Sequence, residues 1–482
     1  MRDAARIATV IEILSSIERG VNSPQLPQNE TGLPPMDGPL DAILAGYFRA
    51  RRYLGSGDRA ALSEQIFTLV RRRARLYWWL ERYNQAHRGE QIALNPRSLV
   101  IANLVLDDRW RRAQFANHFD GDKYNAKPLM AAEVKLVEYL ADKNLADEGA
   151  PDWVRYECPR FLLPNLGAEF AKLQGDNAAH DAKKSGLAAM TDKASLDLRL
   201  NRLQQKSDAE QFRQDVTRDL AAAGITAVAT PLSPVGLRID GHPPISKQDA
   251  FLSGKIEIQD EGSQIVSLLA AAKFSLAGGK KSGGLVLDYC AGAGGKTLAI
   301  AAEMGNRGKI IAADISAKRL ERAQKRFRRA AIHNVECRAL DKENHRFWQR
   351  QSGRFDVVLV DAPCTGTGTW RRNPDMKWRI SGQDITELSA LQSKILREAS
   401  IYVAPGGWLV YATCSLLPEE NEAVIAAFLA EYGEKYSVVP VPSIWQQIFN
   451  HNCPSAGEFL RLYPHIHQCD GFFSAILQAS QK

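Results

Sequence analysis

Two cysteines stand directly after apolar segments that are typical of buried strands. Cys364 ends the string Asp-Ala-Pro-Cys at residues 361–364, and Cys414 lies in the string Thr-Cys-Ser at residues 413–415. A lone cysteine in apolar surroundings is usually an inert core residue, but two at neighbouring strand ends indicate chemistry. Cys414 is expected near the N-terminus of the following helix, a position that favours the nucleophilic thiolate.

Two thiols and the carboxylate of Asp361 would suit methyl transfer to carbon 5 of a cytosine. That carbon is a poor nucleophile until a thiolate adds to carbon 6 and turns the ring into an enamine, so covalent activation divides one difficult step into easier ones. Asp361 is positioned to hold a proton at ring nitrogen 3. A second thiol near the first would help the adduct to break down afterwards.

A glycine-rich turn, DYCAGAGGKT at residues 288–297, follows another apolar segment. Small residues let the backbone approach a ligand closely, and helix N–H groups can face it. Cys290 stands where a Walker A loop needs glycine. A dinucleotide-binding fingerprint that starts at Gly292 would need glycine or alanine at position 297, where Thr297 stands. A nucleoside without a pyrophosphate fits better, and S-adenosylmethionine is such a ligand. Asp314 is expected to bind its ribose hydroxyls and Asp341 its adenine amino group.

The elements that must position these residues are short apolar runs separated by helical patterns. The runs lie at residues 285–288, 309–314, 335–339, 355–361 and 407–413. Such alternation is typical of a parallel sheet covered by helices on both faces, with ligands beyond the carboxyl ends of its strands. The sequence therefore predicts an α/β, doubly wound fold for this part of the chain.

Two other regions precede the sheet. The apolar spacing is helical from Leu40 to about Lys143, whereas residues 175–194 are polar and irregular. Strict alternation over Leu196–Asn201 predicts a strand, and short strands and a helix follow it. A glycine-rich hinge is expected at residues 277–284. We therefore predict three domains: an all-α domain, a linker with a small α+β unit, and a catalytic domain, over residues 1–145, 146–255 and 256–482.

Composition excludes several classes of protein. The 482 residues are 45% hydrophobic and 24% charged, which is ordinary for a globular chain and not for a disordered or collagen-like one. No apolar run approaches the roughly 18 residues that cross a bilayer, and the N-terminus does not resemble a secretory signal. Seven cysteines without a C-x-x-C pair favour reduced thiols in the cytoplasm over a zinc site. We expect neither a membrane nor a metal partner.

The charge pattern permits a polyanionic partner without requiring one, because the net charge is only +7. Residues 318–329 hold seven cations and one anion, and arginines at 71, 72, 73 and 75 stand beside Tyr77, Trp78 and Trp79. Amphipathic helices with solvated basic faces are the first interpretation of both clusters, and RNA-binding faces are the second. His465, His467 and Cys469 alternate as in a strand, for which an edge strand is favoured over a metal site.

Four motifs in order resemble the Nol1/Nop2/Sun family of RNA 5-cytosine methyltransferases. They are D-x-C-A-x-x-G-G-K-T, D-A-P-C, T-C-S and the late string D-G-F-F at residues 470–473. The strings IQDEGSQ at 258–264 and RRNPDMKW at 371–378 are also similar to that family. The similarity covers about residues 195–480, and it implies a class I, Rossmann-like methyltransferase sheet. The regions before it resemble an RRM-like unit and, more weakly, a NusB-like RNA-binding domain.

The resemblance implies a role for each motif residue. Cys414 would be the nucleophile, Cys364 would assist release of the methylated RNA, and Asp361 would contact the cytosine near the cofactor. S-adenosylmethionine would be held by Cys290, Ala291, Gly292, Ala293, Gly294, Gly295, Lys296, Asp314, Asp341 and Asp361. RNA contacts are expected from Lys318, Arg322, Arg371 and Arg372. The family's usual loop reads C-A-A-P-G-G-K, so Gly292 and Ala293 predict a looser turn that still binds the cofactor, with lower affinity.

Three functions are compatible with these observations. The first is methylation of cytosine in RNA by a monomeric enzyme, with 16S ribosomal RNA favoured by the helical N-terminal domain and transfer RNA as the alternative. The second is a non-catalytic RNA-binding factor for ribosome assembly, against which the retained Cys364, Cys414 and Asp361 argue. The third is a DNA cytosine methyltransferase, but those enzymes carry P-C-Q, whereas Thr365 follows Cys364 here.

Overall fold

The computed structural model describes residues 2–18, 25, 29–172, 179–276 and 283–481. The chain forms two compact units, one of Met1–Asp192 with Trp370–Gln383 and the other of Lys193–Thr369 with Asp384–Lys482. The division into three domains at residues 145 and 255 stays a prediction. Most of the hinge expected at residues 277–284 lies outside the described residues.

The first unit is helical, as its apolar spacing predicts. Its helices are α1 (Asp3–Ile17), α2 (Leu40–Ala50), α3 (Ser56–Arg71), α4 (Arg73–Ala86), α5 (Pro96–Leu106), α6 (Arg112–Ala116), α7 (Ala131–Leu140), α8 (Asp152–Arg155), α9 (Leu163–Ala171) and α10 (Ala179–Ala189). The irregular structure expected at residues 175–194 is wrong for α10. This helix packs on α9, where Gly186 makes room for the Phe170 ring: a Cβ atom there would lie 2.3 Å from it. Packing therefore outweighs the polar composition.

A segment that the sequence assigns to the catalytic domain belongs to this helical unit. Residues 370–383 include the 3₁₀ helix η4 (Met376–Trp378), and the Trp378 ring is buried in the unit's hydrophobic core. The indole N–H of Trp378 donates to the Val70 carbonyl at 3.4 Å, and Asp375 Oδ2 accepts from the Leu40 amide at 3.2 Å. The chain thus leaves the second unit just after the Cys364 loop and returns to it at Asp384.

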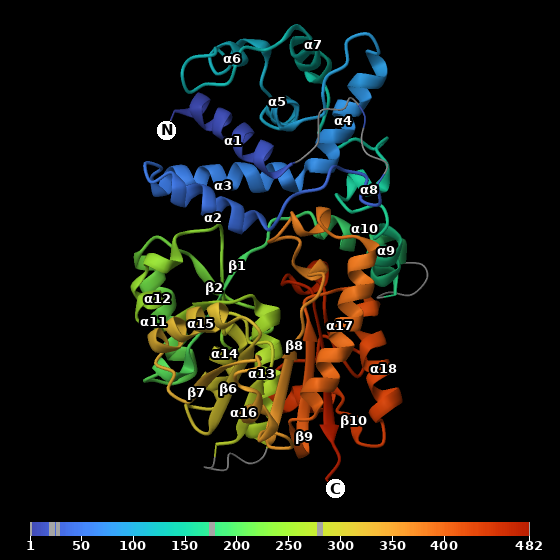
Figure 1. Ribbon diagram of the computed structural model, residues 1–482. Helices are drawn as coiled ribbons and strands as arrows, with labels where there is room; N and C mark the ends of the chain where they lie inside the picture. Colours follow the sequence, from blue (N-terminus) through green and yellow to red (C-terminus); the bar gives the residue numbers. More distant parts are fainter. Residues whose placement is uncertain (1, 19–24, 26–28, 173–178, 277–282, 482) are drawn as a thin grey trace. The chain divides into compact units, whose positions relative to one another are not determined.

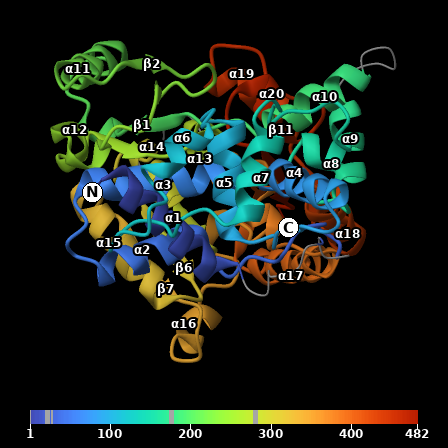
Figure 2. The same ribbon diagram turned by 90° about the horizontal axis from the view of Figure 1, so that it is seen from above.

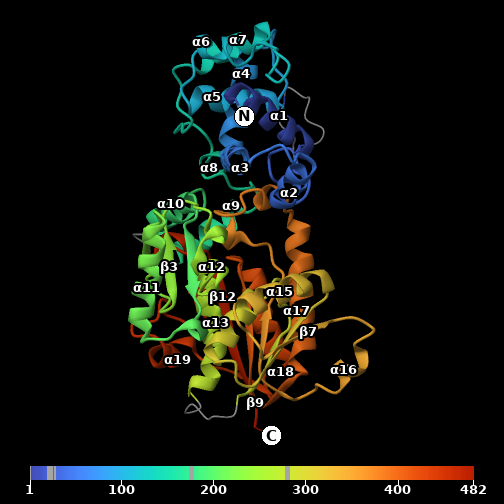
Figure 3. The ribbon, with the colours of Figure 1, turned by 90° about the vertical axis from the view of Figure 1, so that its left-hand side faces the viewer.

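The second unit begins with a small antiparallel sheet in the order β2-β3-β1-β4. Its strands are β1 (Leu196–Leu200), β2 (Ala227–Ala229), β3 (Gly236–Ile239) and β4 (Ile256–Ile258), with the 3₁₀ turns η1 (Arg202–Gln204) and η2 (Ile245–Lys247). Figures 2 and 3 show α11 (Ala209–Ala222) and α12 (Asp249–Leu252) beside this sheet. Asp208 caps α11 by accepting from the Glu210 and Gln211 amides. The strand predicted at Leu196–Asn201 is confirmed by β1, and the helix predicted after it is confirmed by α11.

The main sheet carries the residues expected to do chemistry. Its order is β10-β12-β9-β8-β5-β6-β7, and the strands β5 to β9 are parallel while β12 is antiparallel to its neighbours. The bounds are β5 (Leu285–Asp288), β6 (Lys309–Asp314), β7 (Val335–Ala339), β8 (Phe355–Asp361), β9 (Val403–Thr413), β10 (Tyr436–Val438), β11 (Leu460–Leu462), which pairs with β12, and β12 (Phe472–Ala479).

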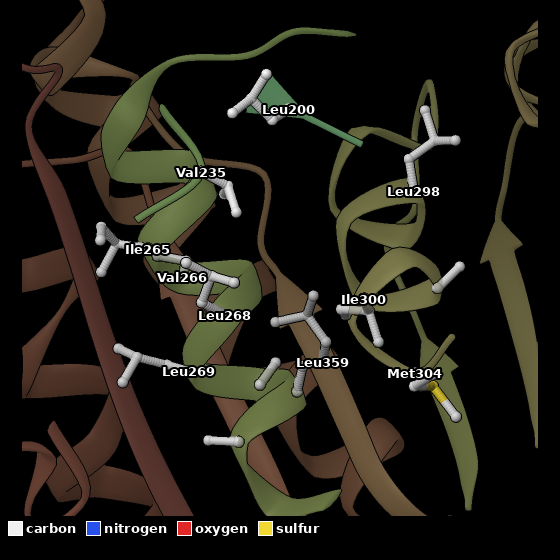
Figure 4. Packing of buried hydrophobic residues seen from close by; sticks show 14 of the residues in the cluster. Leu200, Val235, Ile265, Val266, Leu268, Leu269, Leu298, Ile300, Met304 and Leu359 are labelled. Carbon is white, nitrogen blue, oxygen red and sulfur yellow. The ribbon is translucent and has the colours of Figure 1, made fainter. Parts of the chain in front are cut away.

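Helices cover both faces of this sheet, as Figure 1 shows. One layer contains α13 (Glu261–Leu276), α14 (Gly295–Glu303), α15 (Ala317–Arg329) and α19 (Val441–Ile448), and the other α16 (His345–Gln349), α17 (Gly382–Ser400) and α18 (Glu422–Tyr432). Along β8, Leu359 packs into the first layer and Val358 into the second. Figure 4 shows Leu359 between side chains of α13 and α14. Burial on both faces explains the continuous apolar runs, and the doubly wound α/β fold is confirmed.

The expected edge strand at residues 465–469 is wrong. Pro464–His467 form the short helix α20, which Pro464 begins because its fixed φ suits the first helical position. In the described part of the chain, no group of three or more histidine, cysteine or acidic residues could hold a metal ion. No helix in the same ranges has the length and apolar character to span a bilayer.

Candidate active site

The chemistry-bearing residues meet because β5, β6, β8 and β9 run parallel. Their carboxyl ends therefore lie at one edge of the sheet, where they place Asp288, Asp314, Asp361 and the Thr413–Ser415 turn. This is the edge at which open α/β sheets bind ligands. The site is thus built from strand ends of a rigid sheet and the loops that follow them.

The glycine-rich turn after β5 is shaped by its neighbours. Gly292 and Gly294 both have positive φ, at +55° and +77°, and Gly294 caps the N-terminus of α14. A Cβ atom on Gly294 would lie 2.6 Å from the Phe327 ring of α15, so only glycine fits there. Asp314 accepts the Gly292 amide at 2.9 Å and the Ser316 amide at 2.7 Å, which ties the end of β6 to the turn.

An arginine from α15 braces the turn where the family's proline is absent. Arg326 donates to the Ala293 carbonyl at 2.8 Å and pairs with Glu257 of β4 at 3.2 Å. The Glu257 carboxylate is buried and also pairs with Arg329. A contact from outside the loop thus restrains the turn that its own sequence leaves loose. The lower cofactor affinity expected from Gly292 and Ala293 stays a prediction.

The residues at this turn fit a nucleoside cofactor. Asp288 accepts from the Thr297 hydroxyl at 2.6 Å through Oδ2, whereas its buried Oδ1 has no hydrogen-bond partner. Burial raises the pKa of Asp288 to about 7. Ile315, directly after Asp314, is 81% exposed, which offers an apolar surface to an aromatic base. Carboxylates suit ribose hydroxyls and a sulfonium, and sequence reasoning missed both Asp288 and Ile315.

Two residues expected at the cofactor have different surroundings. Asp341 is exposed, and its Oδ1 accepts both the backbone and the side-chain N–H groups of Asn344, at 2.9 and 2.8 Å. It therefore orders the loop after β7. Cys290 is largely enclosed, and burial, followed by the charge of Asp288, raises the pKa of its thiol. Cys290 thus stays a neutral, small side chain in the turn.

Lys296 connects the cofactor turn with the motif at the end of β8. Its ammonium donates to Asp361 Oδ2 at 2.6 Å, and the exposed fractions of the two side chains are 10% and 31%. Burial acts to lower the pKa of Lys296, but the Asp361 carboxylate outweighs this and the pKa is raised. The Nζ atom lies 5.3 Å from the centre of the Phe472 ring, so the D-G-F-F motif borders the same site. Lys296 therefore keeps its charge, which also acts on Cys414.

The two cysteines at the strand ends face each other. Their sulfur atoms lie 3.4 Å apart, and both side chains are partly exposed. The hydrogen bond with Cys414, together with burial, raises the pKa of the Cys364 thiol well above its usual range. Either sulfur can donate in this contact, and the raised pKa favours Cys364 as the thiol that keeps its proton. The 3₁₀ turn η5 (Pro418–Glu420) separates Cys414 from α18 along the chain, but Asn421, the N-cap of α18, hydrogen-bonds to Thr413 and Ser415 on either side of Cys414.

The basic clusters divide into buried and exposed groups. Lys318 and Arg322 lie exposed on α15, whereas Arg326 and Arg329 are used in the ion pairs with Glu257. Arg371 is buried in the helical unit, where its carbonyl accepts from Arg71 at 2.8 Å, and Arg372 is partly exposed.

The arginine cluster before Tyr77 is engaged in ion pairs within the helical unit. Arg73 is fully buried and pairs with Glu18 at 2.6 Å, and the Tyr77 hydroxyl donates to the same carboxylate. Arg72 pairs with Asp107 and Arg75 pairs with Glu157. The solvated face expected from the sequence is therefore wrong for Arg73, which serves the interior of the helical unit, and RNA binding by the cluster stays a prediction.

Known proteins are similar in sequence to this chain over most of its length. The family model for 16S rRNA methyltransferase RsmB/F matches residues 278–478. A protein of Klebsiella pneumoniae (strain 342) is 36% identical over 388 residues, 77% of this chain and 82% of its own. One of Xanthomonas campestris pv. campestris is 31% identical over 433 residues, 87% of this chain and 89% of its own. Both are named ribosomal RNA small subunit methyltransferase B.

Solved structures share the fold. The crystal structure of PH0851 covers 99% of both chains with a TM-score of 0.68 and 22% identity. NSun6 from Pyrococcus horikoshii, solved with SFG, covers 65% of this chain and 98% of its own, with a TM-score of 0.50 and 20% identity. The resemblance drawn from the motifs is thereby confirmed. The chain belongs to the 16S rRNA methyltransferase RsmB/F family, and it is an S-adenosylmethionine-dependent methyltransferase.

Proposed function

We propose that this protein methylates carbon 5 of a cytosine in 16S ribosomal RNA, with Cys414 as the covalent nucleophile. The observation that carries the proposal is the pair of thiols 3.4 Å apart beside the ion pair of Lys296 and Asp361. A scaffold protein needs no such pair at a ligand-binding edge. The family description and the names of the relatives support ribosomal RNA as the substrate.

The turn at residues 290–296 would hold S-adenosylmethionine together with Asp314 and Asp341. When bound, this cofactor supplies an electrophilic methyl group on a positively charged sulfur. Asp314, already anchored by two amides, retains lone pairs for the ribose hydroxyls. The buried, unpartnered Oδ1 of Asp288 and the exposed side chain of Ile315 add a negative and an apolar surface.

The two thiols would act in sequence on the base. Cys414, as a thiolate beside the Lys296 ammonium, adds to carbon 6 and makes carbon 5 nucleophilic. Asp361 Oδ1, which the ion pair with Lys296 does not use, would accept the N–H group of ring nitrogen 3 and so hold a proton on the ring. Carbon 5 then accepts the methyl group and loses its proton to a water molecule, and the electrons of that C–H bond expel the Cys414 thiolate from carbon 6. Cys364 would assist this release, because its S–H group can stabilise the departing thiolate.

The exposed cations on α15 would contact the RNA backbone. Lys318 and Arg322 project into solvent, and Arg372 is partly exposed, while burial disfavours Arg371 in this role. Phosphate contacts of this kind give binding that weakens with salt. We further propose that the protein acts as a monomer in the cytoplasm, where its thiols stay reduced.

Transfer of a labelled methyl group tests this function. The purified protein is incubated with methyl-labelled S-adenosylmethionine and either unmodified 16S ribosomal RNA or transfer RNA, and the nucleosides are then separated by mass spectrometry. We expect labelled 5-methylcytidine from the 16S RNA, and none with Cys414→Ser. Label on another base, or only in transfer RNA, would contradict the proposed substrate.

A further inference from the structure

We infer that Glu420 is a positioning residue for the methyl-transfer site, which fixes the loop that carries Cys364 and places a buried negative charge beside that thiol. This inference rests on the proposed function of the two cysteines. Glu420 lies in η5, between Cys414 and α18, and it has no place in the motifs that the sequence singled out. Its role follows from its hydrogen bonds and its burial.

The Glu420 carboxylate is fully buried and only accepts hydrogen bonds. Its Oε1 accepts the Thr365 amide at 2.8 Å and the Gln392 side-chain amide at 2.9 Å, and its Oε2 accepts the Thr365 hydroxyl at 2.5 Å. Three converging donors are the environment of an ionised carboxylate, which has acceptors alone. Charge-assisted bonds of this kind are stronger than neutral ones.

These bonds hold the chain on both sides of Cys364. Thr365 follows the cysteine directly, and the Gln392 amide that binds Glu420 also donates to the carbonyl of Pro363, the preceding residue, at 2.9 Å. Gln392 comes from α17 and is itself buried. One carboxylate and one amide thus fix the loop whose sulfur must stay 3.4 Å from Cys414.

Glu420 acts on Cys364 through its charge as well as through its hydrogen bonds. After the hydrogen bond with Cys414, burial and the charge of Cys414, Glu420 is a further cause of the raised pKa of Cys364. The titratable groups that face Cys364 are Tyr411 from β9, Cys414 directly after β9, and Glu420 from η5. Glu420 is the one carboxylate among them.

Glu420→Gln separates the charge from the position. The amide oxygen can still accept from the Thr365 and Gln392 N–H groups, and the new NH₂ group can donate to the Thr365 hydroxyl. The geometry is therefore kept while the negative charge is lost. Glu419→Gln, at the exposed neighbouring position, removes the same charge outside the site and is the matched control.

The test is a pH profile of Cys364 alkylation in a Cys414→Ser background. Iodoacetamide labelling is followed by peptide mass spectrometry, which resolves Cys364 from the other cysteines. We expect Glu420→Gln to move the midpoint about one unit to lower pH, and Glu419→Gln to leave it in place. A midpoint unmoved by Glu420→Gln in a protein with an unchanged melting temperature would overturn the inference.

A second variant keeps the test decisive if Glu420→Gln does not fold. Gln392→Met retains the charge but loses both bonds around the loop, so we expect faster hydrogen exchange at the Thr365 amide with no shift of the midpoint to lower pH. Unchanged exchange there would contradict the positioning role. Neither measurement uses RNA or S-adenosylmethionine, so its failure is distinct from a failure of the methylation assay.

Discussion

The carboxyl ends of β8 and β9 present the same chemical group in two different settings. Cys364, after β8, has the buried carboxylate of Glu420 behind its loop, and the pKa of its thiol is raised. Cys414, after β9, lies 3.4 Å from the Cys364 sulfur and interacts with the charge of Lys296. On the function proposed above, the neighbours of the two thiols, more than the thiols themselves, determine which one holds its proton and which one attacks.

Replacement of the attacking thiol has the largest expected effect. We expect Cys414→Ser to lower turnover at least roughly 1000-fold and to leave no covalent RNA–protein complex, because a serine hydroxyl is a far weaker nucleophile than a thiolate. Turnover and a denaturing gel with labelled RNA measure both effects. An adduct that persists in this variant would reverse the assignment of the two strand ends.

Replacement of the donor thiol should instead stop the reaction later. With Cys364→Ala, adduct formation continues while release slows, so the covalent complex accumulates and turnover falls about 100-fold. Cys364→Ser, which restores a hydrogen-bond donor, measures how much of the effect that bond explains. If Cys364→Ala prevented adduct formation as fully as Cys414→Ser, the two thiols would not differ in the way described.

The cation beside Cys414 can be removed without a change in either thiol. We expect Lys296→Met to slow alkylation of Cys414 at pH 7 about tenfold, because an adjacent positive charge stabilises the thiolate. Alkylation of Cys364, which faces Glu420, should change less. Lys318→Met, on the exposed face of α15, is the control. Equal effects of the two lysine variants would show that the site does not use this charge.

The brace on the cofactor turn should affect S-adenosylmethionine and neither thiol. Arg326→Gln loses a charged hydrogen bond to the Ala293 carbonyl, so the dissociation constant measured by calorimetry should rise roughly tenfold. Arg328→Gln on the same helix is exposed and should have no such effect. Affinity unchanged by Arg326→Gln would mean that the turn needs no support from α15.

The smallest effect is expected far from both strand ends. Lys318→Ala combined with Arg322→Ala should weaken RNA binding a few-fold and reduce the slope of log affinity against log salt by about 1 to 2. Thiol alkylation should stay the same in this double variant. A salt dependence equal to that of the unchanged protein would leave these cations as ordinary surface residues.

Much of the sheet could be predicted because its physics is local. A strand buried on both faces needs a continuous apolar run, and Leu285–Asp288 and Phe355–Asp361 have one. The strand β12 was missed, although the D-G-F-F motif at its start was seen. The helix α10 was missed because its packing against Phe170 depends on a residue outside its own sequence.

The site residues that lie in sequence motifs were predicted. Those whose role depends on contacts between residues far apart in the chain were missed. Asp361, Cys364 and Cys414 follow apolar runs, so the topology of a parallel sheet brings them together. Glu420 acts on the loop of Cys364 from 56 positions further along the chain, and no local pattern reveals this contact. Likewise, Arg73 looks like a surface cation until its buried partner Glu18 is known.

A trapped adduct tests the central claim most directly. RNA in which 5-fluorocytidine replaces cytidine is incubated with the protein and S-adenosylmethionine. The enzyme is released only when carbon 5 loses its proton, and fluorine in place of that hydrogen prevents this step. The complex is digested, and the modified peptide is sequenced by mass spectrometry. We expect the nucleotide to be attached to Cys414. Attachment to Cys364, or no complex with an enzyme that methylates ordinary RNA, would contradict it.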